Sequence, residues 1–141
     1  MMVTTLHECR GPFGLVVSGE AEVWQAALEQ IVGSQWLTTY LVHGDQELLE
    51  LVEAGLADAA VIDESADWRL DVLHLLRMIR RLDALLPVVV VASRTDRRWL
   101  EGALRLTAFS VLAKPVELET LLRQIQRMMT RLDDVLRNEP Y

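Results

Sequence analysis

Asp63 and Lys114 are the two side chains whose types and settings suggest chemistry in this sequence. Asp63 ends a short apolar run at residues 59–62, and Lys114 follows a second apolar run at residues 109–113. Such runs are typical of strands in a parallel sheet, whose carboxyl ends meet at one edge. A carboxylate and an ammonium at that edge can form a structural ion pair. They can also support acyl-phosphate chemistry, in which the lysine counters the charge of a transferred phosphoryl group.

The choice of lysine at position 114 is itself informative. Thirteen of the 14 basic residues are arginine, and Lys114 is the single lysine. An ammonium is a compact, strongly hydrated charge on a flexible stem, which a planar guanidinium does not replace. A specific role for Lys114 and a residue left over by codon bias both remain open.

The elements that must position these two residues follow a regular order. Apolar runs predict strands at residues 13–17, 37–42, 58–63, 88–91 and 109–113. Helical spacing of apolar residues predicts helices at about 20–32, 45–54, 68–82, 96–104 and 117–137. Five strands that alternate with five helices indicate an α/β protein with a doubly wound parallel sheet, covered by helices on both faces.

Composition limits the class of protein. The 141 residues predict one domain over residues 12–138, preceded by an irregular lead-in at residues 1–11. Apolar residues make up 51%, which excludes disorder, and no run reaches the ~20 apolar residues of a membrane span. One cysteine, Cys9, leaves no intramolecular disulfide and favours a cytoplasmic location. A net charge of −7 disfavours nucleic acid as a partner.

Over about residues 13–130 the sequence resembles the receiver domains of two-component response regulators. The resemblance rests on four segments: Leu15-Val16-Val17 before the first helix, Val61-Ile62-Asp63, Pro87 with its valine run, and Ala113-Lys114-Pro115. It implies a flavodoxin-like (βα)5 fold with strand order 2-1-3-4-5. It also implies that Asp63 stands at the phosphoacceptor position, that Lys114 is the phosphate counter-ion, and that the Lys114–Pro115 peptide is cis.

The sequence departs from this family at the metal-binding positions. The family places two adjacent carboxylates after the first strand to hold Mg²⁺, and here those positions are Ser18 and Gly19. The nearest acid, Glu20, comes one residue late. Mg²⁺ depends on carboxylate oxygens in octahedral geometry. We therefore expect no resident cofactor and at most a weak Mg²⁺ site formed by Glu20, Asp63 and Ser65.

The switch positions also differ. The family's switch Ser or Thr at the end of the fourth strand aligns with Ala92, and Ser93 would serve only if the register shifted by one residue. The aromatic partner usual on the fifth strand aligns with Val111.

Three interpretations remain open. The one we favour is a receiver-like domain of a two-component pathway that has lost efficient phosphotransfer and acts by protein–protein interaction, not as an enzyme. The first alternative is an ordinary Mg²⁺-dependent response regulator that is phosphorylated on Asp63. The second is an unrelated flavodoxin-like enzyme or nucleotide binder, although no phosphate-cradling glycine-rich loop follows the first strand.

The last predicted helix suggests how the protein meets its partners. Its apolar residues recur in steps of four and three, as in a heptad seam, and the end of the helix lies beyond where receivers usually stop. We expect a cytoplasmic homodimer that uses Leu132 and Leu136, together with Trp99 on the preceding helix. Histidine kinases or other signalling proteins are the expected partners, and we expect neither nucleic acid nor membrane to be bound.

Overall fold

The computed structural model describes residues 11–93, 96–106 and 109–137, with side chains described as far as Arg131. The five strands are β1 (Phe13–Val17), β2 (Leu37–Leu41), β3 (Ala59–Asp63), β4 (Val88–Ala92) and β5 (Ser110–Ala113). The helices are α2 (Gln25–Val32), which follows a 3-10 helix η1 (Gly19–Trp24), then α3 (Asp45–Glu53), α4 (Val72–Leu82), α5 (Arg97–Leu106) and α6 (Leu118–Arg137).

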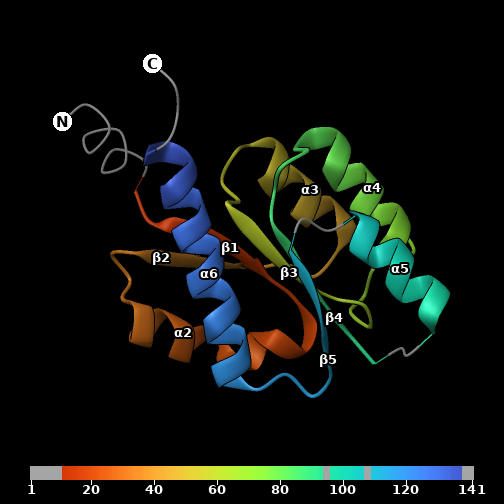
Figure 1. The fold of residues 1–141 in the computed structure, drawn as a ribbon, viewed down its shortest axis with the longest axis horizontal. Coiled ribbons are helices and arrows are strands. Elements are labelled where there is room, and N and C mark those ends of the chain that lie inside the picture. Colours follow the sequence, from red (N-terminus) through yellow and green to blue (C-terminus); the bar gives the residue numbers. More distant parts are fainter. Residues whose placement is uncertain (1–10, 94–95, 107–108, 138–141) are drawn as a thin grey trace.

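The sheet has the predicted architecture. Its strand order is β2-β1-β3-β4-β5, and every neighbouring pair is parallel, so the predicted (βα)5 topology is confirmed (Figure 1). The strand order turns back at β1, so β1 lies between β2 and β3. The carboxyl ends of β1 and β3 are therefore neighbours at the edge where an open α/β sheet places its site.

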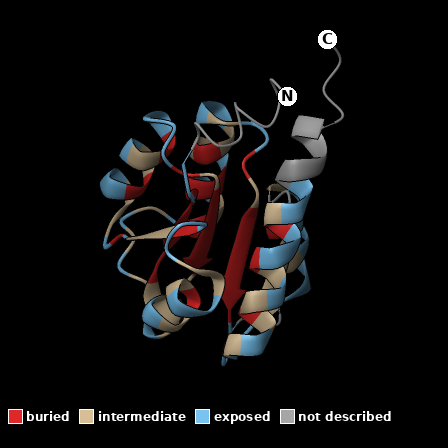
Figure 2. Cartoon of the chain, turned by 90° about the vertical axis from the view of Figure 1, so that its left-hand side faces the viewer, coloured by how far each residue is buried: buried red, intermediate tan, exposed pale blue. Residues whose placement is uncertain are grey.

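Two layers of helices cover the sheet. One core cluster joins alternate strand residues, such as Val16, Ile62 and Val90, to α3, α4 and α5. The other joins the intervening residues, such as Val17 and Val61, to α2 and α6. Strands β1, β3 and β4 are therefore buried along their whole length (Figure 2). Burial on both faces explains why these strands are continuous apolar runs and not alternating ones.

Two helix predictions needed correction. The helix expected from about residue 68 begins at Val72, because the Asp71 carboxylate accepts a hydrogen bond from the Leu73 N–H and caps the helix there. The first predicted helix begins as a 3-10 helix, with three residues per turn. Val23 in this 3-10 segment is exposed, and so is Ile31 in α2.

Other predictions lie partly outside the structure. The lead-in expected at residues 1–11 falls outside the described residues except for Gly11. Within the described residues, no helix has the length and apolar character needed to cross a membrane.

The outer edge of β2 is closed by side chains of α2. The Glu29 carboxylate accepts hydrogen bonds from the Thr39 N–H at 2.9 Å and from the Thr39 hydroxyl at 2.6 Å. The Gln25 amide also donates to the Thr39 hydroxyl, at 2.9 Å. An edge strand normally offers its unpaired N–H groups to other chains. Glu29 thus removes one of these groups from the open edge.

We predict that Glu29→Ala lowers the free energy of unfolding by about 1–2 kcal/mol, because the Thr39 N–H loses its charged acceptor. Glu29→Gln keeps an acceptor and should cost clearly less, and Gln30→Ala on the exposed side of α2 is a matched control. Urea unfolding followed by circular dichroism measures all three. Equal losses for Glu29→Ala and Gln30→Ala would contradict the assignment.

Candidate functional site

The sheet edge brings the predicted acid and base together. Asp63 is the last residue of β3, and Lys114 directly follows β5. The Lys114 Nζ lies 2.7 Å from the Asp63 Oδ1, and the two side chains are 19% and 2% exposed. This is an ion pair at the mouth of the sheet with its carboxylate excluded from solvent.

Both oxygens of the Asp63 carboxylate are occupied by donors. Oδ1 accepts hydrogen bonds from the Ser65 N–H and the Ser65 hydroxyl, each at 2.9 Å, in addition to the Lys114 contact. Oδ2 accepts the Glu20 N–H at 2.7 Å. The Lys114 Nζ also donates to the Ser65 hydroxyl. Lys114 and the two loops that follow β1 and β3 thus enclose the carboxylate.

The ionisation of Asp63 reflects two opposing effects. Burial raises the pKa of its carboxyl group, because a charge is disfavoured away from water. Hydrogen bonds from Lys114, from the Glu20 and Ser65 N–H groups and from the Ser65 hydroxyl outweigh burial and hold the pKa below its usual value. Asp63 is therefore a charged group that its donors stabilise in the folded state.

Ser18 occupies one of the two positions at which the resemblance implies a metal-binding acid. It is fully buried, and its hydroxyl donates to the Val61 carbonyl at 3.0 Å while it accepts from the Asp63 N–H at 3.1 Å. A hydroxyl can do both, whereas an ionised carboxylate only accepts. At this position Ser18 joins the end of β1 to β3.

Gly19 occupies the second position and lets the backbone approach Asp63. Its φ of +62° is unfavourable for residues with a side chain. A Cβ added there would lie 2.3 Å from the Asp63 Cβ and 2.5 Å from Oδ2. A side chain at position 19 therefore cannot coexist with the present position of Asp63.

These residues do not fit a divalent cation. Magnesium requires oxygen ligands, but the groups that face the Asp63 carboxylate are N–H, ammonium and hydroxyl donors. The Glu20 carboxylate accepts the Val116 N–H at 2.9 Å. No cluster of three or more His, Cys, Asp or Glu side chains suited to a metal occurs in the described part of the chain. Glu20, Asp63 and Ser65 are brought together, but as a hydrogen-bonded cap and not as a ligand shell.

The two switch positions lie at the end of β4 without contacting Asp63 through a hydrogen bond. Ala92 is buried, and its carbonyl accepts the Lys114 N–H at 3.1 Å, while its methyl group offers no donor. Ser93 is exposed and donates to the Glu64 carboxylate at 3.3 Å. The Lys114–Pro115 peptide is cis, as the resemblance implies.

Of the three expected interface residues, only Trp99 has a described side chain. Trp99 is 5% exposed and packs into the core beneath α5, so the prediction that it is a surface contact is wrong. The side chains of Leu132 and Leu136 lie outside the described residues. The apolar seam of α6 is explained by core packing as far as it is described, through the buried residues Leu121, Ile125 and Met128.

Few features of the sequence indicate which groups close the site. The indole N–H of Trp68 donates to the Asp63 carbonyl at 2.7 Å and fixes the loop after β3. A serine followed by a glycine after the first strand was the available signal for the role of Ser18 and Gly19. That signal indicates that the two acids implied by the resemblance are absent at these positions. It does not show which backbone group approaches Asp63.

We predict that Gly19→Ala destabilises the protein by at least about 2 kcal/mol more than Gly55→Ala. Both glycines have positive φ, but an added Cβ at Gly55 meets nothing within 4 Å, so the difference isolates the collision with Asp63. Urea denaturation of the two variants provides the comparison. Equal losses would mean that the Gly19 loop can move away from Asp63 at little cost.

We predict that Asp63→Asn lowers the free energy of unfolding at neutral pH by about 2 kcal/mol, because Lys114 loses its charged partner. The pKa of Asp63 is lower in the folded state than in the unfolded state, so its contribution is complete above the unfolded pKa. It is lost as the pH falls through the folded pKa. The difference between wild type and Asp63→Asn should therefore shrink on acidification. Asp67→Asn, at an exposed position, is the matched control for general charge effects. A difference that is independent of pH would contradict the assignment.

Comparisons with known proteins add the fold family. No family model matches the chain, and no curated protein matches it. Several solved structures do. A CheY-like response regulator receiver domain protein from Methanospirillum hungatei has a TM-score of 0.73 and 15% identity, over 87% of this chain and 98% of that one.

Two further structures give the same result. The signal receiver domain of a putative Luxo repressor protein from Vibrio parahaemolyticus has a TM-score of 0.73 and 14% identity, over 92% of this chain and 99% of that one. A response regulator receiver domain protein from Clostridium thermocellum has a TM-score of 0.70 and 18% identity, over 87% of this chain and 98% of that one. The fold of this chain is that of the response regulator receiver domains.

Proposed function

We propose that this chain is a receiver-like signalling domain of a two-component pathway that acts by protein–protein interaction, with phosphorylation of Asp63 weak or lost. The observation that supports this proposal most directly is that both oxygens of the Asp63 carboxylate are already bound by donors. In this proposal Asp63 is an anion that organises the loops around it.

Phosphorylation of Asp63 would require these contacts to open. An attacking carboxylate oxygen must present a lone pair to phosphorus, and the incoming phosphoryl group needs a cation to neutralise its charge. Each hydrogen bond to a charged group that is broken costs about 1.5–3 kcal/mol. Here the Glu20 N–H holds one oxygen, and Ser65 together with Lys114 holds the other. The donor set also does not suit Mg²⁺, so the usual source of charge neutralisation is weak.

One observation favours the alternative of an ordinary phosphoaccepting response regulator. Lys114 contacts Asp63 directly, and a lysine in that position can counter phosphoryl charge once the cap has opened. Ser93 would then have to act as the switch, although its hydroxyl binds Glu64 at the surface. We place this alternative second because it requires the loops after β1 and β3 to rearrange.

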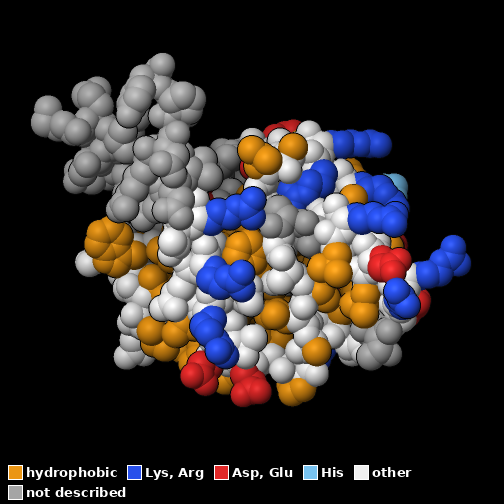
Figure 3. Space-filling view, viewed as in Figure 1, with side chains coloured by type: hydrophobic (Ala, Val, Ile, Leu, Met, Phe, Trp, Pro, Cys, Tyr) orange, Lys and Arg blue, Asp and Glu red, His pale blue; other side chains and the backbone are white. Residues whose placement is uncertain are grey.

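The partners in this proposal are histidine kinases or other signalling proteins in the cytoplasm, and the domain itself is not an enzyme. Affinity for such partners would come from the helical surfaces. The described outward face of α6 carries Arg123, Arg127 and Arg131 in a row, which Figure 3 shows as basic side chains along that helix. A row of guanidinium groups suits an acidic partner surface.

We predict that incubation with a small phosphodonor such as acetyl phosphate and excess Mg²⁺ leaves no stable phosphoryl adduct on Asp63. Intact-mass spectrometry measures the adduct, and a receiver domain known to be phosphorylated under the same conditions is the positive control. Asp63→Asn and Asp67→Asn are the matched variants. An adduct that persists in Asp67→Asn and disappears in Asp63→Asn would establish the alternative instead.

A further inference from the structure

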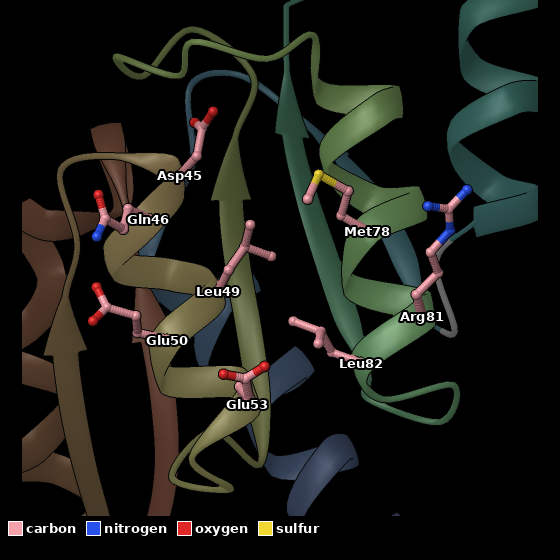
Figure 4. A pocket seen from close by; sticks show the side chains of 8 residues that line it. All are labelled: Asp45, Gln46, Leu49, Glu50, Glu53, Met78, Arg81 and Leu82. Carbon is pink, nitrogen blue, oxygen red and sulfur yellow. The ribbon is translucent and has the colours of Figure 1, made fainter.

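A groove lies between α3 and α4. These two helices cover the face of the sheet opposite α6 (Figure 1). Its volume is about 480 Å³, and it is open to solvent. Leu49 from α3 and Met78 and Leu82 from α4 form its apolar part, and Figure 4 shows Leu82 and Met78 extending from α4 toward α3. The groove is separate from the Asp63 site, which lies at the carboxyl edge of the sheet.

The two walls of the groove carry opposite charge. Helix α3 has four acids and no base, and α4 has three arginines and no acid. Of those arginines only Arg81 lines the groove, and Arg80 donates to the Leu106 carbonyl instead. Glu50 and Glu53 on α3 and Arg81 on α4 line the groove and are exposed. None of the ion pairs found among the described residues joins the two helices. Glu50, Glu53 and Arg81 are therefore available to another surface, whereas Asp45, which also lines the groove, already accepts the Arg69 and Leu70 N–H groups.

Exposed leucines occur where α4 ends. Leu82, in the last turn of α4, is 42% exposed, and Leu85 in the following loop is 83% exposed. An apolar strip bordered by charges has the composition of a protein interface, in which an apolar centre is surrounded by a polar rim.

We propose that this groove is the interface of a symmetric dimer and that its occupant is a second copy of this chain. A two-fold axis along the groove turns the second copy over, so that its α4 faces the α3 of the first and its α3 faces the α4. Glu50 and Glu53 of each copy then lie opposite Arg81 of the other, once on each side of the axis. A two-fold axis across the groove would instead put acids against acids, so the charges select the first arrangement.

The apolar groups agree with the same axis. A rotation about an axis along the groove leaves each residue at its own height along the groove. Leu82 of one copy and Leu82 of the other therefore lie at the same end of the groove, on either side of the axis. On α6, a two-fold axis through the row Arg123, Arg127 and Arg131 would instead place like charges against one another.

Charge reversal tests the proposal. Wild type should be a dimer in sedimentation equilibrium over a concentration series at low salt. Glu53→Arg and Arg81→Glu should each weaken dimerisation by about tenfold or more, because each places like charges opposite one another. Mixing these two variants should restore a dimer, since every contact between residues 53 and 81 then joins an arginine to a glutamate. Circular dichroism checks the fold of each variant, and Glu50→Arg replaces Glu53→Arg if that variant does not fold.

Arg123→Glu on α6 is the matched control, because it reverses an equally exposed arginine outside the groove, and it should leave the dimer intact. Four results would each overturn the proposal: a wild type that stays monomeric across the series, a dimer insensitive to both groove variants, a mixture that stays monomeric, or a dimer that Arg123→Glu dissociates. The last result would assign the interface to α6 instead.

Discussion

The structure depends on one buried charge. The Asp63 carboxylate is almost completely removed from water, and a carboxylate in that setting is tolerated only when donors replace its hydration. Lys114, the Ser65 N–H and hydroxyl, and the Glu20 N–H replace it. These groups come from the segments after β5, β3 and β1, so one anion fixes three loops relative to each other.

The same constraint explains the residues that depart from the receiver pattern. Gly19 brings the backbone against Asp63, which allows the Glu20 N–H to take the place of a solvent molecule or a cation. Ser18 joins β1 to β3 by donating and accepting at once. These two residues form one arrangement, in which a closed hydrogen-bonded cap replaces a pair of acids. At Ala92, where the resemblance implies a switch hydroxyl, the side chain is a buried methyl group that cannot donate to this cap.

Charge is distributed over the rest of the surface in a way that the net value of −7 conceals. Acids are concentrated on α3, and arginines on α4 and α6. Neighbouring surfaces of opposite sign favour selective pairing with other proteins, because complementary fields orient partners and like charges exclude wrong ones. In the proposed function, partners are selected through these surfaces.

The sequence by itself determined the fold, and it placed Asp63 and Lys114 at one edge. Buried strands between helices are recognisable in the sequence as local apolar runs, and the carboxyl ends of parallel strands lie at the same edge of the sheet. Only the tertiary structure decided what surrounds Asp63. The packing of loops and helices sets three features that the sequence does not show. These are the contact of the Glu20 N–H with Asp63, the hydrogen bond from Trp68 to the Asp63 carbonyl, and the burial of Trp99. Residue type and spacing do not encode those distances, because each is set by segments that lie far apart in the chain.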